Sequence, residues 1–285
     1  MSYETIIYRQ EGRVGVITLN RPQRLNAISK QLALEVAQAL DDIEKDEKLR
    51  VAVITGGPRP DGRPCFCAGA DISAQAKEPR ETMFEDYGII EGIEEMIKPH
   101  EAVVRSSSEK VDLPVLLEKI RWLTKPVIAS IDGICSAGGL EMALTCDMRV
   151  VAETAQLSDL HMKNLNRVGG GGITALLALT VGMAKAKELA ITGDAVDGNE
   201  AVRIGLANRV FPPDKFWEGT MALANKIAER HPAAVRMCKV AVDYAFYPLM
   251  ESALRYNHLC RAALKPIVQS DQVAKDFVAK VKPKV

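Results

Sequence analysis

A glutamate in a glycine-rich segment is the clearest candidate for acid/base chemistry in this chain. Glu141 follows Gly138 and Gly139, just after the predicted helix start at Leu140. Glycine lets a ligand approach the backbone, and unpaired N–H groups at a helix start favour negative charge. The pattern indicates a carboxylate beside amides that stabilise an oxyanion. Glycines used only for packing, with an exposed Glu141, are the alternative, but the flanking Leu140 and Met142 favour a site.

Alternating strand-like and helix-like segments must position this glutamate. Apolar runs predict buried strands over Val51 to Gly56, Lys125 to Ile131 and Met148 to Val151. Helical patterns cover Lys30 to Glu44, Leu140 to Leu144, Thr174 to Leu179, Ala184 to Ile191 and Asn199 to Gly205. This alternation is typical of an α/β fold.

The pattern becomes helical throughout after Pro212. Helices are predicted over Phe216 to Arg230, Ala233 to Tyr247, Pro248 to Leu264 and Ser270 to Val281. We therefore expect a separate helical region at the C-terminal end.

Several segments, in order along the chain, closely resemble the enoyl-CoA hydratase/isomerase (crotonase) superfamily. The closest are Phe66 to Asp71 and Lys125 to Asp147. Further likeness covers Val14 to Pro22, Leu25 to Ile28, Ala155 to Leu157, Gly169 to Gly172, Leu189 to Asp194 and Gly205 to Val210. The resemblance implies an α/β fold with a crotonase-type spiral core of repeated ββα units and a C-terminal helical region.

The resemblance also implies a division of the chain. The core covers residues 1–211, and the C-terminal helical region, 212–285, forms a homotrimer or homohexamer in such proteins. Between Asp71 and Pro126 the chain is longer than a typical hydratase, which predicts an insertion over about residues 75–113 near the acyl pocket. A substrate-shaping lid and a solvated surface helix are equally compatible with this insertion.

Site residues follow from the same resemblance. The backbone N–H groups of Ala70 and Gly138 are expected to form an oxyanion hole for the thioester of an acyl-CoA substrate. No permanently bound cofactor is expected, because coenzyme A arrives as part of the substrate. The implied CoA-binding residues are Arg24, Leu25, Ala68, Ala70, Asp71 and Ile72. The implied substrate-pocket residues are Asp159, Asn164 and Gly169.

The second catalytic position departs from the family pattern. Glu141 matches the first catalytic glutamate of hydratases, but His161 stands where they have the second. Imidazole titrates near neutrality and both donates and accepts protons, so water addition remains chemically possible. The alternative is an ordinary loop histidine satisfied by Asp159, Asn164 or the backbone. We take Glu141 and His161 as the catalytic pair.

Hydration and dehydration of an α,β-unsaturated acyl-CoA is therefore the preferred reaction. Double-bond isomerisation is the close rival, because it needs proton removal and return but no clamped water. Decarboxylation or C–C hydrolysis through the same enolate is also compatible. A catalytically silent, oligomeric CoA-binding protein is the alternative from another functional class.

Composition agrees with a metabolic enzyme. The 285 residues carry a formal net charge of zero and 26% charged residues, so neither a nucleic-acid surface nor an acidic tail is indicated. No apolar stretch reaches the roughly 18 residues that span a bilayer, and Met1 to Glu4 does not begin a secretory signal, so a cytoplasmic protein without membrane contact is expected. The six cysteines are expected to be reduced, and Cys65 and Cys67 lack zinc-site spacing, so no metal is expected.

Overall fold

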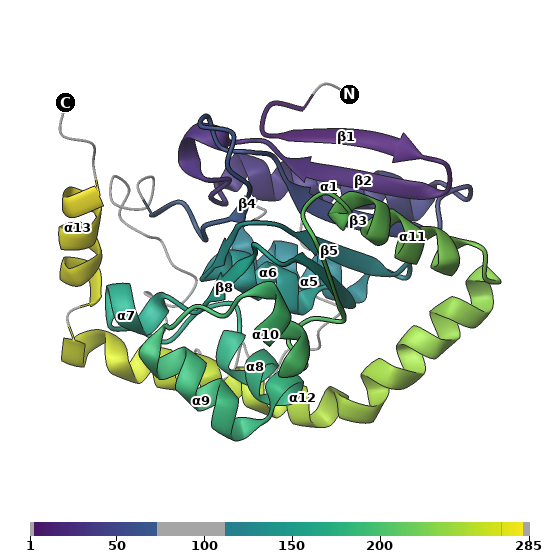
Figure 1. Ribbon diagram of the computed structural model, residues 1–285. Coiled ribbons are helices and arrows are strands. Elements are labelled where there is room, and N and C mark those ends of the chain that lie inside the picture. Colours follow the sequence, from purple (N-terminus) through teal and green to yellow (C-terminus); the bar gives the residue numbers. More distant parts are fainter. Residues whose placement is uncertain (1–2, 73–111, 269, 282–285) are drawn as a thin grey trace.

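The computed structural model describes residues 3–72, 112–268 and 270–281 (Figure 1). The predicted insertion over residues 75–113 lies outside the described residues except at its last two positions. Both interpretations of that insertion therefore stay predictions.

The described strands form two sheets. The larger sheet has the order β1 (Ile6–Glu11), β2 (Val14–Leu19), β3 (Val51–Gly56), β5 (Val127–Ile131), β7 (Met148–Ala152) and β9 (Arg209–Phe211). Its first pair is antiparallel and its later pairs are parallel. The smaller sheet is parallel, with the order β4 (Cys65–Cys67), β6 (Ile134–Ser136) and β8 (Gln156–Ser158).

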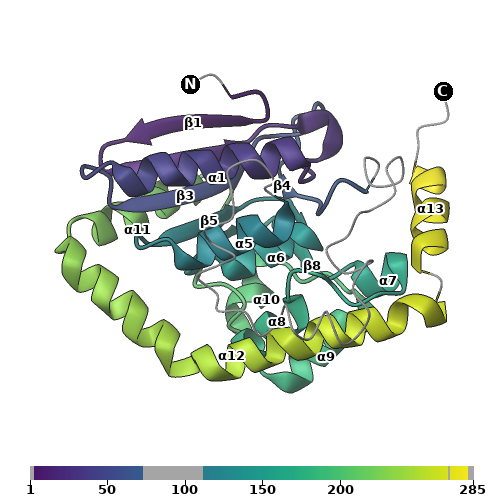
Figure 2. The same ribbon diagram turned by 180° about the vertical axis from the view of Figure 1, so that it is seen from behind.

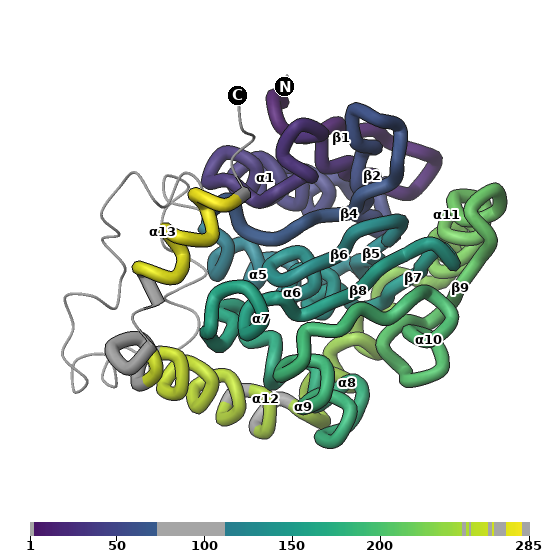
Figure 3. The backbone as a smooth tube through the Cα atoms, turned by 60° about the vertical axis from the view of Figure 1, so that its left-hand side comes forward, coloured from purple at the N-terminus to yellow at the C-terminus, as the bar shows by residue number. Residues whose placement is uncertain are grey.

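Two repeats of the chain each give one strand to each sheet and then form a helix, whereas β1 and β2, which precede α1, both belong to the larger sheet. Strand β5 turns into β6, which leads to helix α6 (Gly138–Thr145), and β7 leads through β8 to α7 (His161–Leu165). The turn after β5 requires glycine, because Gly133 has φ +66° and a Cβ there would lie 2.0 Å from the carbonyl oxygen of Pro64. This order confirms the predicted spiral of ββα units, and it places the small sheet beside α6 (Figure 3).

Five of the other described helices match predicted ones: α1 (Lys30–Lys45), α8 (Ile173–Val181), α9 (Met183–Thr192), α10 (Gly198–Arg203) and α11 (Phe216–Ala228). The sequence did not predict η1 (Pro22–Arg24), α5 (Leu113–Trp122) or α7. Side-chain caps fix three of the starts, among them those of α1 and α10. Ser29 accepts a hydrogen bond from the N–H of Leu32 at 3.1 Å, and Asp197 accepts one from Glu200 at 2.8 Å.

Helices cover both faces of the larger sheet. Ile17 and Ile54 belong to the core cluster under α1 and α5, whereas Val16 and Val53 pack with Leu223 of α11 on the other face (Figures 1 and 2). This alternation follows the period of two along a strand. Helix α11 therefore packs on the sheet as part of the core, although it follows residue 211. The division of the chain after residue 211 stays a prediction.

The C-terminal region corrects one prediction. The sequence predicted two helices that meet at residues 247 and 248, but a single helix, α12 (Pro232–Val268), runs through, followed by α13 (Ser270–Val281). Proline inside a helix removes one backbone hydrogen bond. Contacts on both sides compensate: Lys239 Nζ lies 2.9 Å from Asp147 Oδ2, and Asn257 Nδ2 donates to the carbonyl of Gly169 at 3.0 Å. No described helix is long and apolar enough to cross a membrane.

Candidate active site

Helix α6 is fixed at both ends and buried along its whole length. At its start, a Cβ on Gly139 would lie 2.3 Å from the carbonyl oxygen of Cys67, so only glycine allows this approach to β4. At its end, the buried Arg149 donates from Nη1 to the carbonyls of Ala143 and Cys146, at 3.3 and 3.0 Å. The fold thus holds the helix start rigidly in place.

The segment around Ala70 is held by a parallel bridge to Ile28. The N–H of Ile28 donates to the carbonyl of Gly69, and the N–H of Asp71 donates to the carbonyl of Ile28, both at 2.8 Å. Because both bonds use the neighbours of Ala70, its own N–H points away from Ile28. The Ala70 nitrogen lies near the start of α6, 3.0 Å from where a Cβ on Gly138 would be.

The backbone nitrogens of Ala70 and Gly138 lie side by side. A Cβ on Gly138 would lie 3.0 Å from the nitrogen of Ala70, and a Cβ on Gly69 would lie 3.3 Å from the nitrogen of Gly138. Within residues 3–72, 112–268 and 270–281, neither N–H donates to a protein acceptor. The structure thus brings together the two amides that the sequence indicated as a pair, and a substrate oxygen is a suitable acceptor for both.

The carboxylate of Glu141 reaches across to the glycine loop, residues 169–172. Glu141 is 1% exposed, and its Oε1 accepts a hydrogen bond from the N–H of Gly171 at 2.7 Å. A Cβ at Gly169 would lie 2.7 Å from Oε1, and one at Gly171 would lie 2.6 Å from Oε2. Glycines at these positions therefore leave the room that the carboxylate needs.

The imidazole of His161 and the carboxylate of Glu141 both lie next to Gly169. A Cβ on Gly169 would lie 2.9 Å from His161 Nδ1, which is itself 2.7 Å from Oδ1 of Asp159. Burial lowers the pKa of His161, but the charges of Glu141 and Asp159 and the Asp159 hydrogen bond raise it by more. Arg261 acts in the lowering direction, and the net pKa is raised. The protonated imidazole is favoured by its two acidic neighbours.

The three predicted substrate-pocket residues lie in different settings. Gly169 is buried between Glu141 and His161, and Asp159 contacts His161. Asn164 lies on α7, one turn after His161, and is half-buried. Among the described residues, no side-chain hydrogen bond joins Asn164 to the acid/base pair, so its role stays a prediction.

The predicted CoA-binding residues lie in two segments that run side by side. The N–H of Ala68 donates to the carbonyl of Leu25 at 3.0 Å, and the half-buried Ile72 follows Asp71. The carboxylate of Asp71 forms a 2.8 Å ion pair with Arg21, a residue that sequence reasoning did not select. Asp71 thus fastens one segment to the other.

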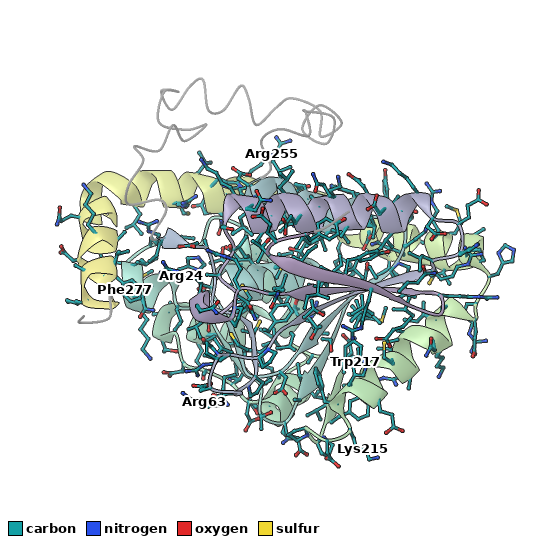
Figure 4. The ribbon with its side chains drawn as sticks, turned by 90° about the horizontal axis from the view of Figure 1, so that it is seen from above. Arg24, Arg63, Lys215, Trp217, Arg255 and Phe277 are labelled. Carbon is teal, nitrogen blue, oxygen red and sulfur yellow. The ribbon has the colours of Figure 1, made fainter. Side chains whose placement is uncertain are left out.

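Arg24 belongs to the first of these segments. It ends η1, is exposed, and lies on the side of the molecule that also carries α13 (Figure 4). An exposed guanidinium at this position is accessible to an anionic ligand.

Comparison with known proteins identifies the family. The family model described as enoyl-CoA hydratase/isomerase matches residues 9–89 and 91–283. The chain belongs to this family. A probable enoyl-CoA hydratase of Mycobacterium bovis is 33% identical over 284 residues, covering 99% of this chain and 98% of that protein. A short-chain-enoyl-CoA hydratase of Clostridium acetobutylicum is 31% identical over 257 residues, covering 90% and 88%.

Solved structures support the same assignment. An enoyl-CoA hydratase from Bacillus anthracis has a TM-score of 0.71 at 29% identity, covering 98% of this chain and 92% of that one. A structure from Mycobacterium avium subsp. paratuberculosis, at 22% identity and a TM-score of 0.75, shows the shared fold. The enoyl-CoA hydratase/isomerase fold predicted from the sequence is thereby confirmed.

Sequence reasoning missed that helix α12 contributes side chains to the candidate site of this family member. Asn257 donates to the carbonyl of Gly169, Leu254 Cδ2 lies 2.1 Å from where a Cβ on Gly172 would be, and Arg261 Nη1 lies 2.6 Å from where one on Gly170 would be. These three side chains are spaced three and four residues apart, so they share one helix face. That spacing was a usable signal, but it does not say which loop the face meets.

Neither metal chemistry nor thiol chemistry is indicated by the described residues of this family member. Among them, no three His, Cys, Asp or Glu side chains gather as metal ligands. Burial raises the pKa of Cys65 to about 11 and those of Cys67 and Cys146 to about 12. All three thiols are free and buried, which is typical of cysteines that serve packing.

Proposed function

We propose that this protein is an enoyl-CoA hydratase, which adds water across the α,β double bond of an acyl-CoA thioester and catalyses the reverse dehydration. The observation that supports it most is that helix α6 begins beside the N–H of Ala70 and also carries the buried Glu141, whose carboxylate faces His161 across Gly169. Family membership implies an acyl-CoA substrate and chemistry without a resident cofactor. The hydratase names of the relatives from Mycobacterium and Clostridium support the reaction.

The amide pair stabilises the charge that the reaction creates. When water attacks the β-carbon, the electrons of the double bond move toward the carbonyl, and the thioester oxygen becomes negative. The N–H groups of Ala70 and Gly138 donate to that oxygen, and the dipole of α6 adds to the effect. Because the fold holds both donors in advance, they need no reorganisation during the reaction.

The acid/base pair moves the protons. Glu141 accepts one proton from the attacking water as its oxygen bonds to the β-carbon, and His161 donates one proton to the α-carbon of the enolate. This division agrees with the raised pKa of His161, which favours the imidazolium form. Proton exchange with solvent then restores both groups.

Arg24 is proposed to bind the phosphates of coenzyme A. It is exposed at the end of η1, next to Leu25, whose carbonyl is bonded to the N–H of Ala68. The two segments that carry these residues lead directly to Ala70. A CoA molecule held along them would therefore direct its thioester toward the amide pair.

Double-bond isomerisation is the second candidate, and one observation favours it. His161 stands where hydratases have their second carboxylate, and isomerisation needs only removal and return of a proton. Glu141 alone is sufficient for such a shuttle. The oxyanion-binding amides serve both reactions equally.

Labelled water separates the two candidates. Crotonyl-CoA is incubated with the protein in ¹⁸O-water, and the product is analysed by mass spectrometry. We expect one ¹⁸O atom at the β-carbon with the parent protein and loss of this product with Glu141→Gln. An unlabelled product with a shifted double bond, from a 3-enoyl-CoA, would assign isomerase activity instead. Product no higher than in a protein-free control, from both parent and Glu141→Gln, would reject both and favour a non-catalytic CoA-binding protein.

Assembly into a homotrimer or homohexamer is proposed from family membership and from α12. Large apolar side chains are exposed on this helix: Met237, Val240, Val242, Tyr244, Phe246, Leu249, Tyr256 and Leu259. Exposed apolar surface of this extent is typical of an interface. Light scattering on the purified protein tests this proposal: we expect the mass of a trimer or hexamer, and a smaller mass for Phe246→Glu.

A further inference from the structure

The carboxylate of Asp159 binds His161, two positions further along the chain. Asp159 is 2% exposed and follows β8, whereas His161 begins α7. Oδ1 of Asp159 lies 2.7 Å from His161 Nδ1 and also accepts the backbone N–H of His161 at 3.1 Å. One oxygen atom thus binds both the ring and the main chain of the same histidine.

This contact selects which ring nitrogen carries the proton. A carboxylate oxygen only accepts, so the nitrogen that faces it must carry hydrogen. In the neutral imidazole the proton then lies on Nδ1, and Nε2 is the nitrogen that exchanges protons with other groups. Among the described residues, no hydrogen-bond partner occupies Nε2.

We propose that Asp159 is the positioning residue of His161, which it holds with Nδ1 turned to its carboxylate so that Nε2 delivers the proton to the substrate. The inference rests on the proposed function, because it assigns to an Asp159–His161 pair the place that a single glutamate has in hydratases. It replaces the substrate contact that the sequence suggested for Asp159.

The charged groups around His161 set the expected pH response. Glu141 on α6 and Asp159 raise the pKa of His161, and Arg261 on α12 lowers it. Lys163, on the same helix, lies along Gly193 instead. When the charge of Asp159 is removed, only Glu141 still raises the pKa of His161, and Arg261 opposes it. The imidazolium form is then less stabilised.

The pH profile of kcat/KM for hydration tests the pair. His161 donates a proton, so activity falls as pH rises through its pKa, and Asp159→Asn should move this basic limb to lower pH. We expect kcat to fall about tenfold to a hundredfold with KM within about twofold. Asp214→Asn, an exposed aspartate in a turn, is the matched control and should leave the profile unchanged. An unmoved limb, or a raised KM at constant kcat, would overturn the proposal.

A double variant provides a second test. If Asp159 acts only through His161, Asp159→Asn combined with His161→Gln should be no slower than His161→Gln alone. Losses that multiply would show that Asp159 works independently of the imidazole, which contradicts the proposal.

Histidine NMR on the substrate-free protein tests the contact without any activity. The chain has four histidines, so His161→Gln identifies the ¹⁵N signals of residue 161. Above the pKa, the parent protein should show the tautomer with hydrogen on Nδ1, and Asp159→Asn should lower the titration midpoint. An Nε2–H tautomer in the parent would overturn the inference even where Asp159→Asn does not fold. Because this readout is independent of turnover, absence of hydratase activity would reject the proposed function but leave the Asp159–His161 contact to the NMR result.

Discussion

The two sides of the site are built by different means. On the proposed oxyanion side, the donors are backbone N–H groups: Ala70 lies next to the bridge hydrogen bonds to Ile28, and Gly138 begins a helix that is buried throughout. On the acid/base side, side chains meet across Gly169, and His161 begins a helix of only five residues.

The position of the amide pair is determined by the fold, whereas the acid/base groups are determined by single residues. The amide pair depends on glycines and on sheet register, so most exposed substitutions leave it intact. The acid/base side depends on the carboxylates of Asp159 and Glu141 and the imidazole of His161, so one substitution changes the electrostatic environment of its neighbours. Among members of the family, we therefore expect the acid/base side to differ with the reaction catalysed. The oxyanion side, which activates the thioester, should be shared.

The largest expected effect comes from removing the buried carboxylate. Glu141→Gln keeps the shape of the side chain but removes its ability to accept a proton, so kcat should fall by about a thousandfold. Steady-state hydration of crotonyl-CoA measures this loss. Glu188→Gln on the surface of α9 is the matched control. A decrease of less than about tenfold would mean that Glu141 does not carry the proton.

A smaller loss is expected when the glycine loop is filled. In Gly171→Ala the new Cβ would lie 2.6 Å from Glu141 Oε2 and 2.5 Å from Leu117 Cδ1, so the carboxylate must move. We expect kcat to fall by about a hundredfold, because misplacement of a catalytic group is costly. Gly62→Ala meets open space and should cost only about 1 kcal/mol of stability from its positive φ. Full activity of Gly171→Ala would show that Glu141 tolerates displacement.

Restoring the hydratase pattern should weaken, not improve, this protein. His161→Glu places a third carboxylate beside Asp159 and Glu141, and like charges this close oppose one another's ionisation. We expect about a tenfold loss of crotonyl-CoA hydration at neutral pH. A marked gain would indicate that the native reaction is one of the alternatives to hydration.

The smallest expected effect is on the pH dependence of stability. The pKa of His161 is raised above its ordinary value of 6.5 in the folded protein, so the stabilisation is full below that value. It is lost as pH rises through the raised pKa. Urea denaturation at several pH values should show this loss in the parent and in His231→Gln but not in His161→Gln. The same slope in all three would mean that His161 is not stabilised as imidazolium.

Much of the backbone side could be predicted from the sequence, because its signals are local. Gly138 and Gly139 mark a close approach and the run from Lys125 to Ile131 marks a buried strand, whereas the pairing with Ala70 came from the resemblance to the family. The helix starts at Ser29 and Asp197 also follow local capping chemistry. Such features depend on neighbours along the chain.

The rest depends on contacts between distant segments, which a sequence pattern does not contain. Proline at position 248 indicated a helix end, but α12 continues because its two halves are anchored elsewhere. The N–H of Gly171 as the partner of Glu141 required the position of a loop 30 residues away. The placement of Arg261 against Gly170 likewise required the packing of α12 on α8.

Helix α12 is continuous but bends part-way along (Figures 1 and 2), and it connects two distant parts of the molecule. Lys239 joins it to Asp147, just beyond the end of α6, and Asn257 joins it to the loop that faces Glu141. The helical segment between these anchors is about 27 Å long. A binding partner that displaced α12 would therefore also displace the loop that donates to Glu141, so contacts on the outer face of this helix are expected to alter the proposed site.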